Sequence, residues 1–476
     1  MKGLSQEQAD KEYLIMMIIK LDDGTYNIFD TLGDMGIWNM DREGLSKYLN
    51  LIKQERRFSK DDVRSYPLLE SLYSTTKHYQ PSIKEDEGPF IKEIIQQGLP
   101  MKCYFDTDIV LKNADKYQHE IINPPSISLD VNKVCNFSCK WCCVDIKSGD
   151  PHGGMSADHI LEKIIKPMVA MGNLTWYLVG GEPGLTPVKT AEIAGSITRY
   201  TAMYSSEKPF IALDTNGTNF VENARLFKES GINTIQFSLS SSSPDVDRYF
   251  RGIPPLINSV ELVKNAVNTA KALGMHCGIN MVVWKESKGR HNFEEIEGII
   301  DLAFDLKADF IRVTPAVTVG AAAKNGMDMD IHDLKYIEQT ISNKHHFMGE
   351  NVSTRIISIV PLHEEKLTSL YDEAPLTCRA GTCFIHIDHC GYVYPCALVM
   401  PDFCIGNVNK DNIIDLWRSS NVMIEWRTVM DISEECACCA YRNCCFGRCP
   451  AYAWFKFRSI DLRERPLDCQ LLKACC

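Results

Sequence analysis

Three cysteines in one short run constrain this chain most. Cys135, Cys139 and Cys142 have the spacing C-x3-C-x2-C and follow a short alternating polar–apolar run over 126–131, which is typical of a strand. Iron–sulfur clusters are generally held by four cysteine thiolates, so three ligands in one loop would leave one iron of a cubane open for another molecule. The spacing alone is also compatible with a zinc loop or with three unrelated cysteines. The choice between them depends on residues elsewhere in the chain.

The composition excludes several classes of protein. A chain of 476 residues is long enough for two or three domains. Its net charge of −11, with no concentrated basic run, argues against a nucleic-acid partner. No stretch approaches the ~18–20 apolar residues of a membrane span, and the polar start MKGLSQEQADKEYL is unlike a signal peptide. Without an export signal, twenty cysteines indicate metal or redox use, so we expect a cytoplasmic protein.

Strand and helix patterns alternate from about 126 to 320. The candidate strands cover 126–131, 175–179, 210–214, 234–239, 276–283 and 309–314. This alternation predicts a parallel sheet with right-handed crossovers. In barrels built this way the chemistry lies at the C-terminal ends of the strands. The polar or metal-binding residues at or near these ends are Cys135, Glu182, Thr215, Ser238, Asn280 and Thr314.

About forty residues after the cysteines, the run WYLV ends in GGEP at 180–183. In this order, the cysteines and GGEP resemble the radical S-adenosylmethionine (SAM) superfamily, over most of residues 120–476. The resemblance implies an α/β fold with a partial (βα)6 barrel. It also implies a [4Fe–4S] cluster on Cys135, Cys139 and Cys142, with the open iron chelating SAM. The SAM contacts that it implies are Gly180, Gly181, Glu182, Pro183, Thr215, Ser238, Arg251, Asn280 and Thr314.

Two of these contacts carry a specific role by resemblance. The GGEP segment would contact the amino group of SAM. Arg251 would pair with the SAM carboxylate, which suits the geometry of a guanidinium. Ser238 ends a run like the family's fourth strand, but Ser240 stands where relatives carry an acid. The substrate side of that strand therefore departs from the family pattern.

The C-terminal cysteines form a second motif, which resembles the SPASM extension of radical SAM proteins. Cys378 is followed by Gly391-x4-Cys396, and later by a C-x2-C-x5-C-x3-C run and a last cysteine. The resemblance implies a loop-rich C-terminal domain with two auxiliary [4Fe–4S] clusters. The first would use Cys378, Cys383, Cys396 and Cys449, and the second Cys436, Cys439, Cys445 and Cys469.

Some cysteine roles stay open. Either Cys383 is a ligand of the first auxiliary cluster, or that cluster keeps an open site at this iron. A zinc ribbon is the alternative explanation of the paired cysteines. Relatives use a further cysteine to deliver a hydrogen atom or to carry substrate, for which Cys143 and Cys404 are the candidates. Burial as a small apolar side chain is the alternative for both.

The region before the barrel is expected to be a small α+β domain. Two apolar runs in YLIMMIIKLDDGTYNIFDTL, joined by Asp-Asp-Gly, predict a hairpin. The domain is either a winged-helix-like module that recognises a leader peptide or a cap on the barrel. We therefore expect domains over 1–120, 121–350 and 351–476.

The expected reaction is reductive cleavage of SAM to a 5′-deoxyadenosyl radical, with electrons from a donor such as flavodoxin or ferredoxin. The cofactor supplies the radical chemistry and the protein positions it. The first expected substrate is a ribosomally made peptide, which would gain a thioether or a carbon–carbon cross-link. Oxidation or epimerisation of a small molecule such as an aminoglycoside is the alternative. Sulfatase maturation is disfavoured because Ala397 replaces its catalytic aspartate. A purely electron-carrying protein is disfavoured by GGEP.

Overall fold

The computed structural model describes sixteen stretches of the chain. They are residues 13–14, 16–20, 23–30, 36–53, 102–103, 105–116, 121–144, 153–287, 289–327, 329, 331–348, 354–358, 380–381, 383–400, 402–428 and 454.

Six parallel strands form the centre of the main sheet, as the alternating pattern predicts. They are β6 (Ser126–Asp130), β7 (Thr175–Val179), β8 (Phe210–Thr215), β9 (Thr234–Ser238), β10 (His276–Val283) and β11 (Phe310–Pro315). Each pairs in parallel with the next strand in the chain. The expected α/β fold with a parallel radical SAM-type sheet is confirmed, and the strand bounds differ from the prediction by one residue at most.

Four strands from the C-terminal region extend this sheet at both edges. They are β12 (Arg355–Ser358), β13 (Phe384–Ile387), β14 (Tyr392–Tyr394) and β15 (Gly406–Asn407). β12 pairs in parallel with β11, and β13 pairs in parallel with β6. The resulting strand order is β12-β11-β10-β9-β8-β7-β6-β13-β14-β15. The sequence pattern did not predict these four strands. The domain boundaries stay a prediction, but the region after 351 completes the sheet of the region before it.

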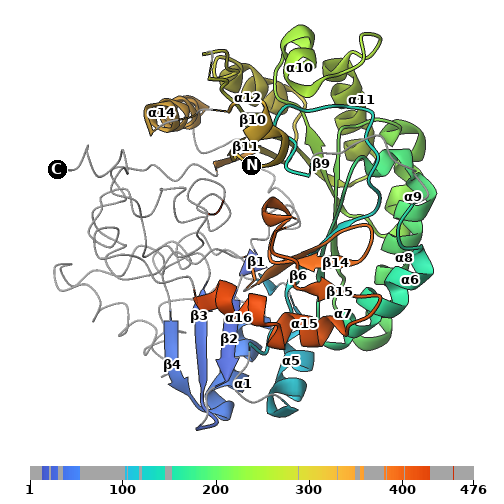
Figure 1. Ribbon diagram of the computed structural model, residues 1–476, viewed down its shortest axis with the longest axis vertical. Coiled ribbons are helices and arrows are strands. Elements are labelled where there is room, and N and C mark those ends of the chain that lie inside the picture. The colour runs from blue at the N-terminus through green and yellow to red at the C-terminus, as the bar shows by residue number, and fades with distance from the viewer. Residues whose placement is uncertain are drawn as a thin grey trace, which may run out of the picture.

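Helices cover one face of this curved sheet (Figure 1). The crossover elements are α6 (Ala157–Ile160), η2 (Leu161–Ile165), α7 (Lys166–Ala170), α8 (Pro187–Tyr204), α9 (Phe220–Ser230), α10 (Pro244–Arg251), α11 (Ser259–Ala272), α12 (Glu295–Asp305), α13 (Gly320–Lys324) and α14 (Ile331–Met348). Alternate strand residues such as Leu129, Trp176 and Ile279 are fully buried against them in one core. The helices hold this outer face because burying apolar area is the main driving force for folding.

The opposite, inner face of the sheet carries polar side chains. A side chain in a strand alternates between the two faces, so the residues between the core positions point inward. These inner-face residues include Ser128, Asp130, Asp214, Gln236, Ser238, Asn280, Arg312, Thr314 and His386. A sheet that is apolar under its helices and polar on its other face has the arrangement expected of a ligand-binding half-barrel.

The described N-terminal part contains an antiparallel sheet of β2 (Met16–Lys20), β3 (Tyr26–Asp30) and β4 (Gly36–Met40). β2 and β3 form the hairpin predicted from Asp-Asp-Gly. β1 (Tyr13–Leu14) pairs in parallel with β5 (Lys102–Cys103), and α1 (Arg42–Lys53) contacts α5 (Thr107–Asn113), which is followed by η1 (Ala114–Lys116). The unit is α+β, as expected.

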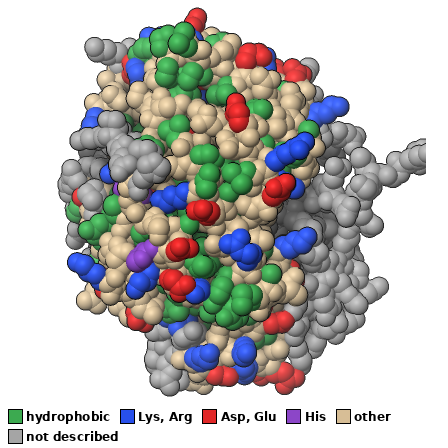
Figure 2. Space-filling view, turned by 90° about the vertical axis from the view of Figure 1, so that its right-hand side faces the viewer, with side chains coloured by type: hydrophobic (Ala, Val, Ile, Leu, Met, Phe, Trp, Pro, Cys, Tyr) green, Lys and Arg blue, Asp and Glu red, His purple; other side chains and the backbone are tan. Residues whose placement is uncertain are grey.

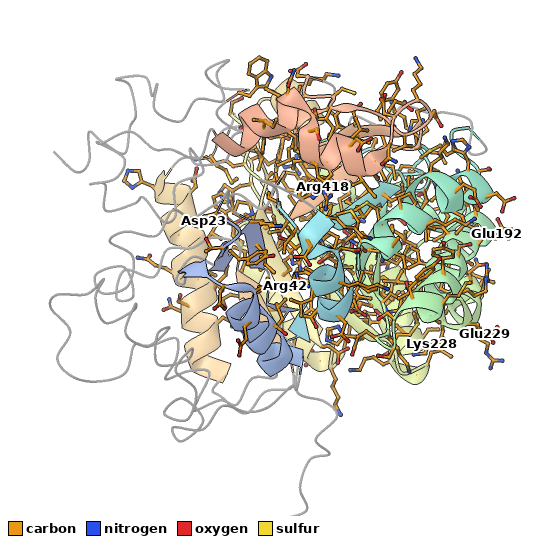
Figure 3. The ribbon with its side chains drawn as sticks, turned by 90° about the horizontal axis from the view of Figure 1, so that it is seen from below. Asp23, Arg42, Glu192, Lys228, Glu229 and Arg418 are labelled. Carbon is orange, nitrogen blue, oxygen red and sulfur yellow. The ribbon has the colours of Figure 1, made fainter. Side chains whose placement is uncertain are left out.

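This N-terminal unit is joined to the barrel by specific hydrogen bonds. The amide of Ile122 donates to the carbonyl of Ile18 at 2.9 Å, and the amide of Ile18 donates to the buried Asn123 side chain at 2.8 Å. Arg42 of α1 forms an ion pair with Asp115 after α5. In Figure 3, Arg42 lies between these two helices, far from the labelled residues of the outer helices α8 and α9.

The remaining described elements follow the second hairpin. η4 (Ala397–Val399), α15 (Ile413–Ser419) and α16 (Asn421–Thr428) lie beside β14 and β15 (Figure 1). On the face drawn in Figure 2, acidic and basic side chains alternate over the described residues, without a patch of one sign. None of the described helices is both long and apolar enough to cross a bilayer.

Candidate functional site

The cysteine loop is held against the GGEP segment by backbone hydrogen bonds. The amide of Gly181 donates to the carbonyl of Asn132 at 3.1 Å, and the amide of Glu182 donates to that of Val134 at 2.6 Å. A Cβ at position 181 would lie 1.9 Å from the Val134 carbonyl oxygen, and one at 180 would lie 2.6 Å from that of Asn132. The two glycines therefore let the cysteine loop approach, and Gly180, with φ at 129°, also needs the left-handed backbone region. Pro183 then starts the buried turn η3 (Pro183–Leu185).

The other side of the cysteine loop is held by α10 and α13. The amides of Ser138 and Lys140 donate to the carbonyls of Arg251 and Phe250, at 3.1 and 3.0 Å. The start of α13 adds a hydrogen bond to the carbonyl of Cys142 at 2.9 Å. Carbonyls at the C-terminal end of a helix lack intrahelical partners, so α10 satisfies its own end while it fixes the loop.

The three thiols of the loop suit an iron–sulfur cluster better than a single metal ion. Burial raises the pKa of Cys135 to about 11 and that of Cys139 to about 12, and the charges of neighbouring cysteines of the loop raise both further. Tetrahedral zinc at ~2.3 Å from each sulfur needs sulfurs ~4 Å apart. Among the described residues, the ligand atoms that all lie within 4.8 Å of one another belong to Asp388, His389 and Cys390, not to this loop. The loop thus suits a larger cluster, whose binding would displace the thiol protons.

Arg251 lies beside the cysteines rather than at a free surface. It is 1% exposed, and its guanidinium forms an ion pair with Asp247 at 3.1 Å and donates a hydrogen bond to the Cys139 sulfur. It also lies over the ring of Phe137, 5.1 Å from the centroid. The positive charge opposes the rise in the Cys139 pKa that burial causes. In this arrangement Arg251 favours a thiolate at Cys139, a role that the sequence prediction of a SAM carboxylate contact did not include.

Glu182 is buried with donors on both carboxylate oxygens. Thr215 Oγ1 donates to Oε1 at 2.6 Å, the Gly184 amide donates to Oε1 at 2.7 Å, and the Asn216 amide donates to Oε2 at 2.6 Å. Burial nevertheless raises the pKa of Glu182 to about 7, although these hydrogen bonds and Arg251 oppose the rise. A cationic group that binds beside this carboxylate would restore its ionised form.

Three asparagines that the sequence analysis did not single out connect the loop to the ends of β7 and β8. Asn132 Nδ2 donates to the carbonyl of Glu182 at 2.9 Å. Asn216 Nδ2 donates to Asn136 Oδ1 at 2.9 Å, and Asn136 Nδ2 donates to Thr218 Oγ1 at 3.0 Å. The sequence could have indicated Asn216, because it directly follows Thr215 at the end of a predicted strand. These amides fix the orientation of the cysteine loop.

The other predicted SAM contacts lie on the inner face of β9 to β11. Ser238 pairs in register with Asn280, and Thr314 Oγ1 donates to Asn280 Oδ1 at 3.3 Å. Arg312 and Asp214 lie on the same face, and burial raises the pKa of Asp214 to about 6 while Arg312 opposes the rise. Ser238, Asn280 and Thr314 are therefore neighbours of one another. Thr215 instead belongs to the Glu182 group, through the hydrogen bond described above.

Two of the predicted auxiliary-cluster ligands are described. Cys383 is 1% exposed and precedes β13, and Cys396 caps η4, where its sulfur accepts from the Leu398 amide at 3.5 Å. They lie at the same end of the β13–β14 hairpin, since these two strands are antiparallel. The ligands that fall outside the described residues are Cys378, Cys436, Cys439, Cys445, Cys449 and Cys469.

The two candidate cysteines for a further role are both partly buried. Burial raises the pKa of Cys143 to about 12, and the charges of Cys142 and Asp130 add to the rise. Cys404 Sγ contacts the Gly406 carbonyl at 3.4 Å, and burial raises its pKa. These surroundings favour the protonated thiol at both positions.

Comparison with known proteins identifies both motifs. The family model of the radical SAM superfamily matches residues 130–306, and that of the SPASM iron–sulfur cluster-binding domain matches residues 378–445. Two "AdoMet-dependent heme synthase" proteins are similar in sequence. That of Oleidesulfovibrio alaskensis is 25% identical over 357 residues, 72% of this chain and 86% of its own length. That of Methanosarcina barkeri is 24% identical over 349 residues, 69% of this chain and 93% of its own length.

Two solved structures share the fold. Streptococcus suis SuiB bound to S-adenosylmethionine matches with a TM-score of 0.60 at 16% identity, over 95% of this chain and 98% of SuiB. Native anSMEcpe with bound AdoMet matches with a TM-score of 0.54 at 18% identity, over 73% of this chain and 95% of anSMEcpe. Together with the two family matches and the parallel sheet that carries the cysteine loop, they show that this chain is a radical SAM enzyme with a C-terminal SPASM domain.

Proposed function

We propose that this enzyme oxidises a ribosomally made peptide and forms a thioether or a carbon–carbon cross-link in it. The likeness in fold to SuiB supports this, because it extends over 95% of the chain and therefore over most of the N-terminal 120 residues. SuiB has also been crystallised with its precursor peptide SuiA. A domain before the barrel that binds a peptide leader would explain why this chain carries the additional α+β unit.

The N-terminal sheet offers a plausible place for that leader. β4 pairs with β3 alone among the described strands, so its other edge has no strand partner within the described part of the chain. Extended peptides bind such edges by adding a strand, with backbone hydrogen bonds for affinity and alternate side chains for specificity. The hydrogen bonds between Ile18 and the residues that precede the barrel would keep a leader bound here at a fixed distance from the cysteine loop.

The cofactors of the proposal are SAM and three [4Fe–4S] clusters. Cys135, Cys139 and Cys142 would hold the cluster that binds SAM, and bound SAM would supply the 5′-deoxyadenosyl radical. Glu182 would face the SAM amino group. The two auxiliary clusters would use the eight C-terminal cysteines named above, and a flavodoxin or ferredoxin would deliver electrons.

Mass spectrometry of the anaerobically reconstituted enzyme tests this function. The enzyme would be incubated with SAM, a reductant and the short peptide encoded beside its gene, and 5′-deoxyadenosine would be quantified in the same sample. A peptide that loses two hydrogens, with fragments that locate a new bond, is the expected result. Formation of 5′-deoxyadenosine with an unchanged peptide would contradict the peptide substrate and favour a small molecule.

A second candidate is an activity related to heme formation, favoured by the sequence relatives. Their identity of 24–25% extends over about 70% of this chain, which exceeds the identity to SuiB. Arg312 on the inner face would suit a carboxylate-bearing tetrapyrrole. Incubation with an iron-porphyrin precursor under the same conditions, followed by absorption spectroscopy and mass analysis, would separate this candidate from the first.

A further inference from the structure

A buried carboxylate and a buried imidazole face each other at the end of β6. Asp130 Oδ2 lies 3.5 Å from His386 Nε2, and the two residues are 6% and 1% exposed. The second ring nitrogen, Nδ1, lies 3.1 Å from Ser128 Oγ, which orients the ring. His386 Nε2 itself has no hydrogen-bond partner. The imidazole is thus held by one nitrogen while the other is directed at a carboxylate beyond good hydrogen-bond geometry.

Such an arrangement costs free energy in the absence of a ligand. A buried polar atom without a partner loses its hydrogen bonds to water and gains none from the protein. Nearly all buried polar groups in folded proteins have partners, so an exception calls for an explanation. His386 Nε2 is such an exception, and a small shift that shortens its 3.5 Å distance to Asp130 Oδ2 would satisfy it.

The pair lies where the two halves of the enzyme meet. Asp130 is the last residue of β6, five positions before Cys135 in the chain. His386 lies on β13, in register with Ser128 on β6. A substrate on the inner face near the cysteine loop would therefore lie near Asp130, which is 6% exposed, whereas His386 is 1% exposed.

The titratable groups around Asp130 come from four neighbouring segments. Cys143 belongs to the cysteine loop, His386 to β13, Asp388 and His389 to the turn after it, and Tyr394 to β14. Burial raises the pKa values of Cys143, Asp388 and Tyr394 and lowers that of His389. Each of these shifts favours the uncharged form of its group.

The chemistry of the proposed function requires a base that the sequence motif does not supply. Removal of two hydrogens from a peptide takes away one hydrogen atom, one proton and one electron. The hydrogen atom goes to the 5′-deoxyadenosyl radical and the electron to an iron–sulfur centre. The proton needs an acceptor, and Ala397 stands where sulfatase-maturing relatives carry an aspartate. The peptide cross-linking reaction therefore needs a different carboxylate.

We propose that Asp130 accepts this substrate proton and that His386 is the positioning residue that orients the carboxylate and stabilises its charge. The proposal rests on the oxidative function proposed above. A general base accelerates a reaction only when it lies within hydrogen-bond reach of the proton that it accepts. Because Ser128 holds the His386 imidazole, His386 can fix the position of the Asp130 carboxylate.

The test compares Asp130→Asn, Asp130→Glu and His386→Gln with the unaltered enzyme. The substrate is the peptide encoded beside the gene, deuterated at carbon, so that each abstraction event places deuterium in 5′-deoxyadenosine. The readout is oxidised peptide per deuterated 5′-deoxyadenosine. This ratio isolates the step after abstraction, because a merely structural defect lowers both quantities together. The pH dependence of the ratio is recorded in parallel.

We expect Asp130→Asn to lower the ratio at least about tenfold and to remove its acid limb, since general bases contribute about 10²–10⁴-fold. His386→Gln should lower the ratio less, and Asp130→Glu should restore most of it. An unchanged ratio in Asp130→Asn and His386→Gln would overturn the proposal, and so would equal losses of oxidised peptide and deuterated 5′-deoxyadenosine. Failure of the proposed function would be distinct, because the unaltered enzyme would then leave the peptide unmodified.

Discussion

At the scale of single residues, Glu182 is a buried carboxyl whose charge state depends on what binds beside it. Its carboxylate accepts from Thr215, Gly184 and Asn216, yet burial brings its pKa to about 7. Near neutral pH it is therefore partly protonated until a cation approaches. The amino group of SAM, once its nitrogen coordinates the open iron, would donate its N–H groups to this carboxylate, which accepts them in its ionised form.

SAM affinity should consequently fall with acidity. Because binding requires Glu182 to lose its proton, the dissociation constant should rise about tenfold for each pH unit below about 7 and level off above it. Calorimetric titration of SAM into the reconstituted enzyme at about pH 6 and about pH 8 measures this. Glu182→Gln should bind SAM weakly and without that pH dependence. Equal affinities of the unaltered enzyme at both pH values would contradict the prediction.

The backbone around Gly181 leaves no room for a side chain. In Gly181→Ala the new Cβ would lie 1.9 Å from the Val134 carbonyl oxygen, so the cysteine loop would have to move. We expect a loss of about 1–3 kcal/mol or more in unfolding free energy and less bound iron per chain. Gly195→Ala in α8 is the matched control, because the nearest atom there is the flexible end of Arg199 and alanine favours a helix. Iron analysis and anaerobic urea unfolding compare the two variants, and equal iron content would argue against the steric account.

At the scale of elements, α10 has two ion pairs with opposite environments. Arg251 and Asp247 face the cysteine loop and are almost completely buried, and Asp247 also accepts from the Ser240 amide at 2.9 Å. Arg248 and Asp245 pair on the outer side of the same helix, where Asp245 is 89% exposed. The helix therefore provides its own control for the effect of burial.

Breaking the inner pair should cost far more than breaking the outer one. Asp247→Ala leaves the Arg251 charge buried without its partner, so we expect a loss of about 3–5 kcal/mol in unfolding free energy. Asp245→Ala, which removes the exposed member of the outer pair, should cost about 0–1 kcal/mol. Urea unfolding under anaerobic conditions measures both. Similar losses in the two variants would mean that the inner pair does not carry the attachment of α10 to the loop.

The strands of the barrel could be predicted from sequence to within a residue, and those of the second half could not. Strands such as β7 and β10 are predicted by a run of apolar and β-branched residues followed by a turn. β13 and β14 are short, and their partner β6 is distant in the chain, so no local pattern indicates the pairing. The backbone hydrogen bonds between α10 and the cysteine loop are hidden for the same reason, because Ser138 and Lys140 lie far before their acceptors in the chain.

At the scale of the whole molecule, the two faces of the main sheet serve different purposes. Trp176 is fully buried against the outer helices. Gln236 lies on the inner face, where its amide donates to Asp214 at 3.2 Å. The sheet therefore separates the residues that hold the fold together from those available to a substrate.

Substitutions on the two faces should have separable effects. Trp176→Ala should cost about 3–5 kcal/mol in unfolding free energy, because it leaves a cavity in the core. Gln236→Ala should cost about 1 kcal/mol, the net value of one hydrogen bond, and should raise the KM for the peptide with a smaller change in kcat. Urea unfolding and steady-state kinetics make the comparison. A Gln236→Ala enzyme with unchanged kinetics would mean that the inner face near β9 does not meet the substrate.

Only some of the site residues on and near the inner face could be predicted from the sequence. The cysteines and Glu182 are found from short motifs, because their partners are close in the chain. Asp130 and His386 are not, since His386 lies on a strand whose paired residue, Ser128, is 258 positions earlier. Only the pairing of β13 with β6 in the folded sheet brings the two together.

The parallel pairing of β13 with β6 has a consequence for attempts to recombine such enzymes. β6 carries the cysteine loop, and β13, whose preceding residue is Cys383, satisfies the backbone groups along its edge, including the Ser126 amide at 2.7 Å from the Cys383 carbonyl. The β13–β14 hairpin is thus a structural part of the sheet that carries the cysteine loop, and it is not an interchangeable attachment. In a chimera that exchanges this hairpin between relatives, β13 would pair with a β6 from another parent, next to the cysteine loop. A viable crossover point must therefore keep β6 and β13 from the same parent.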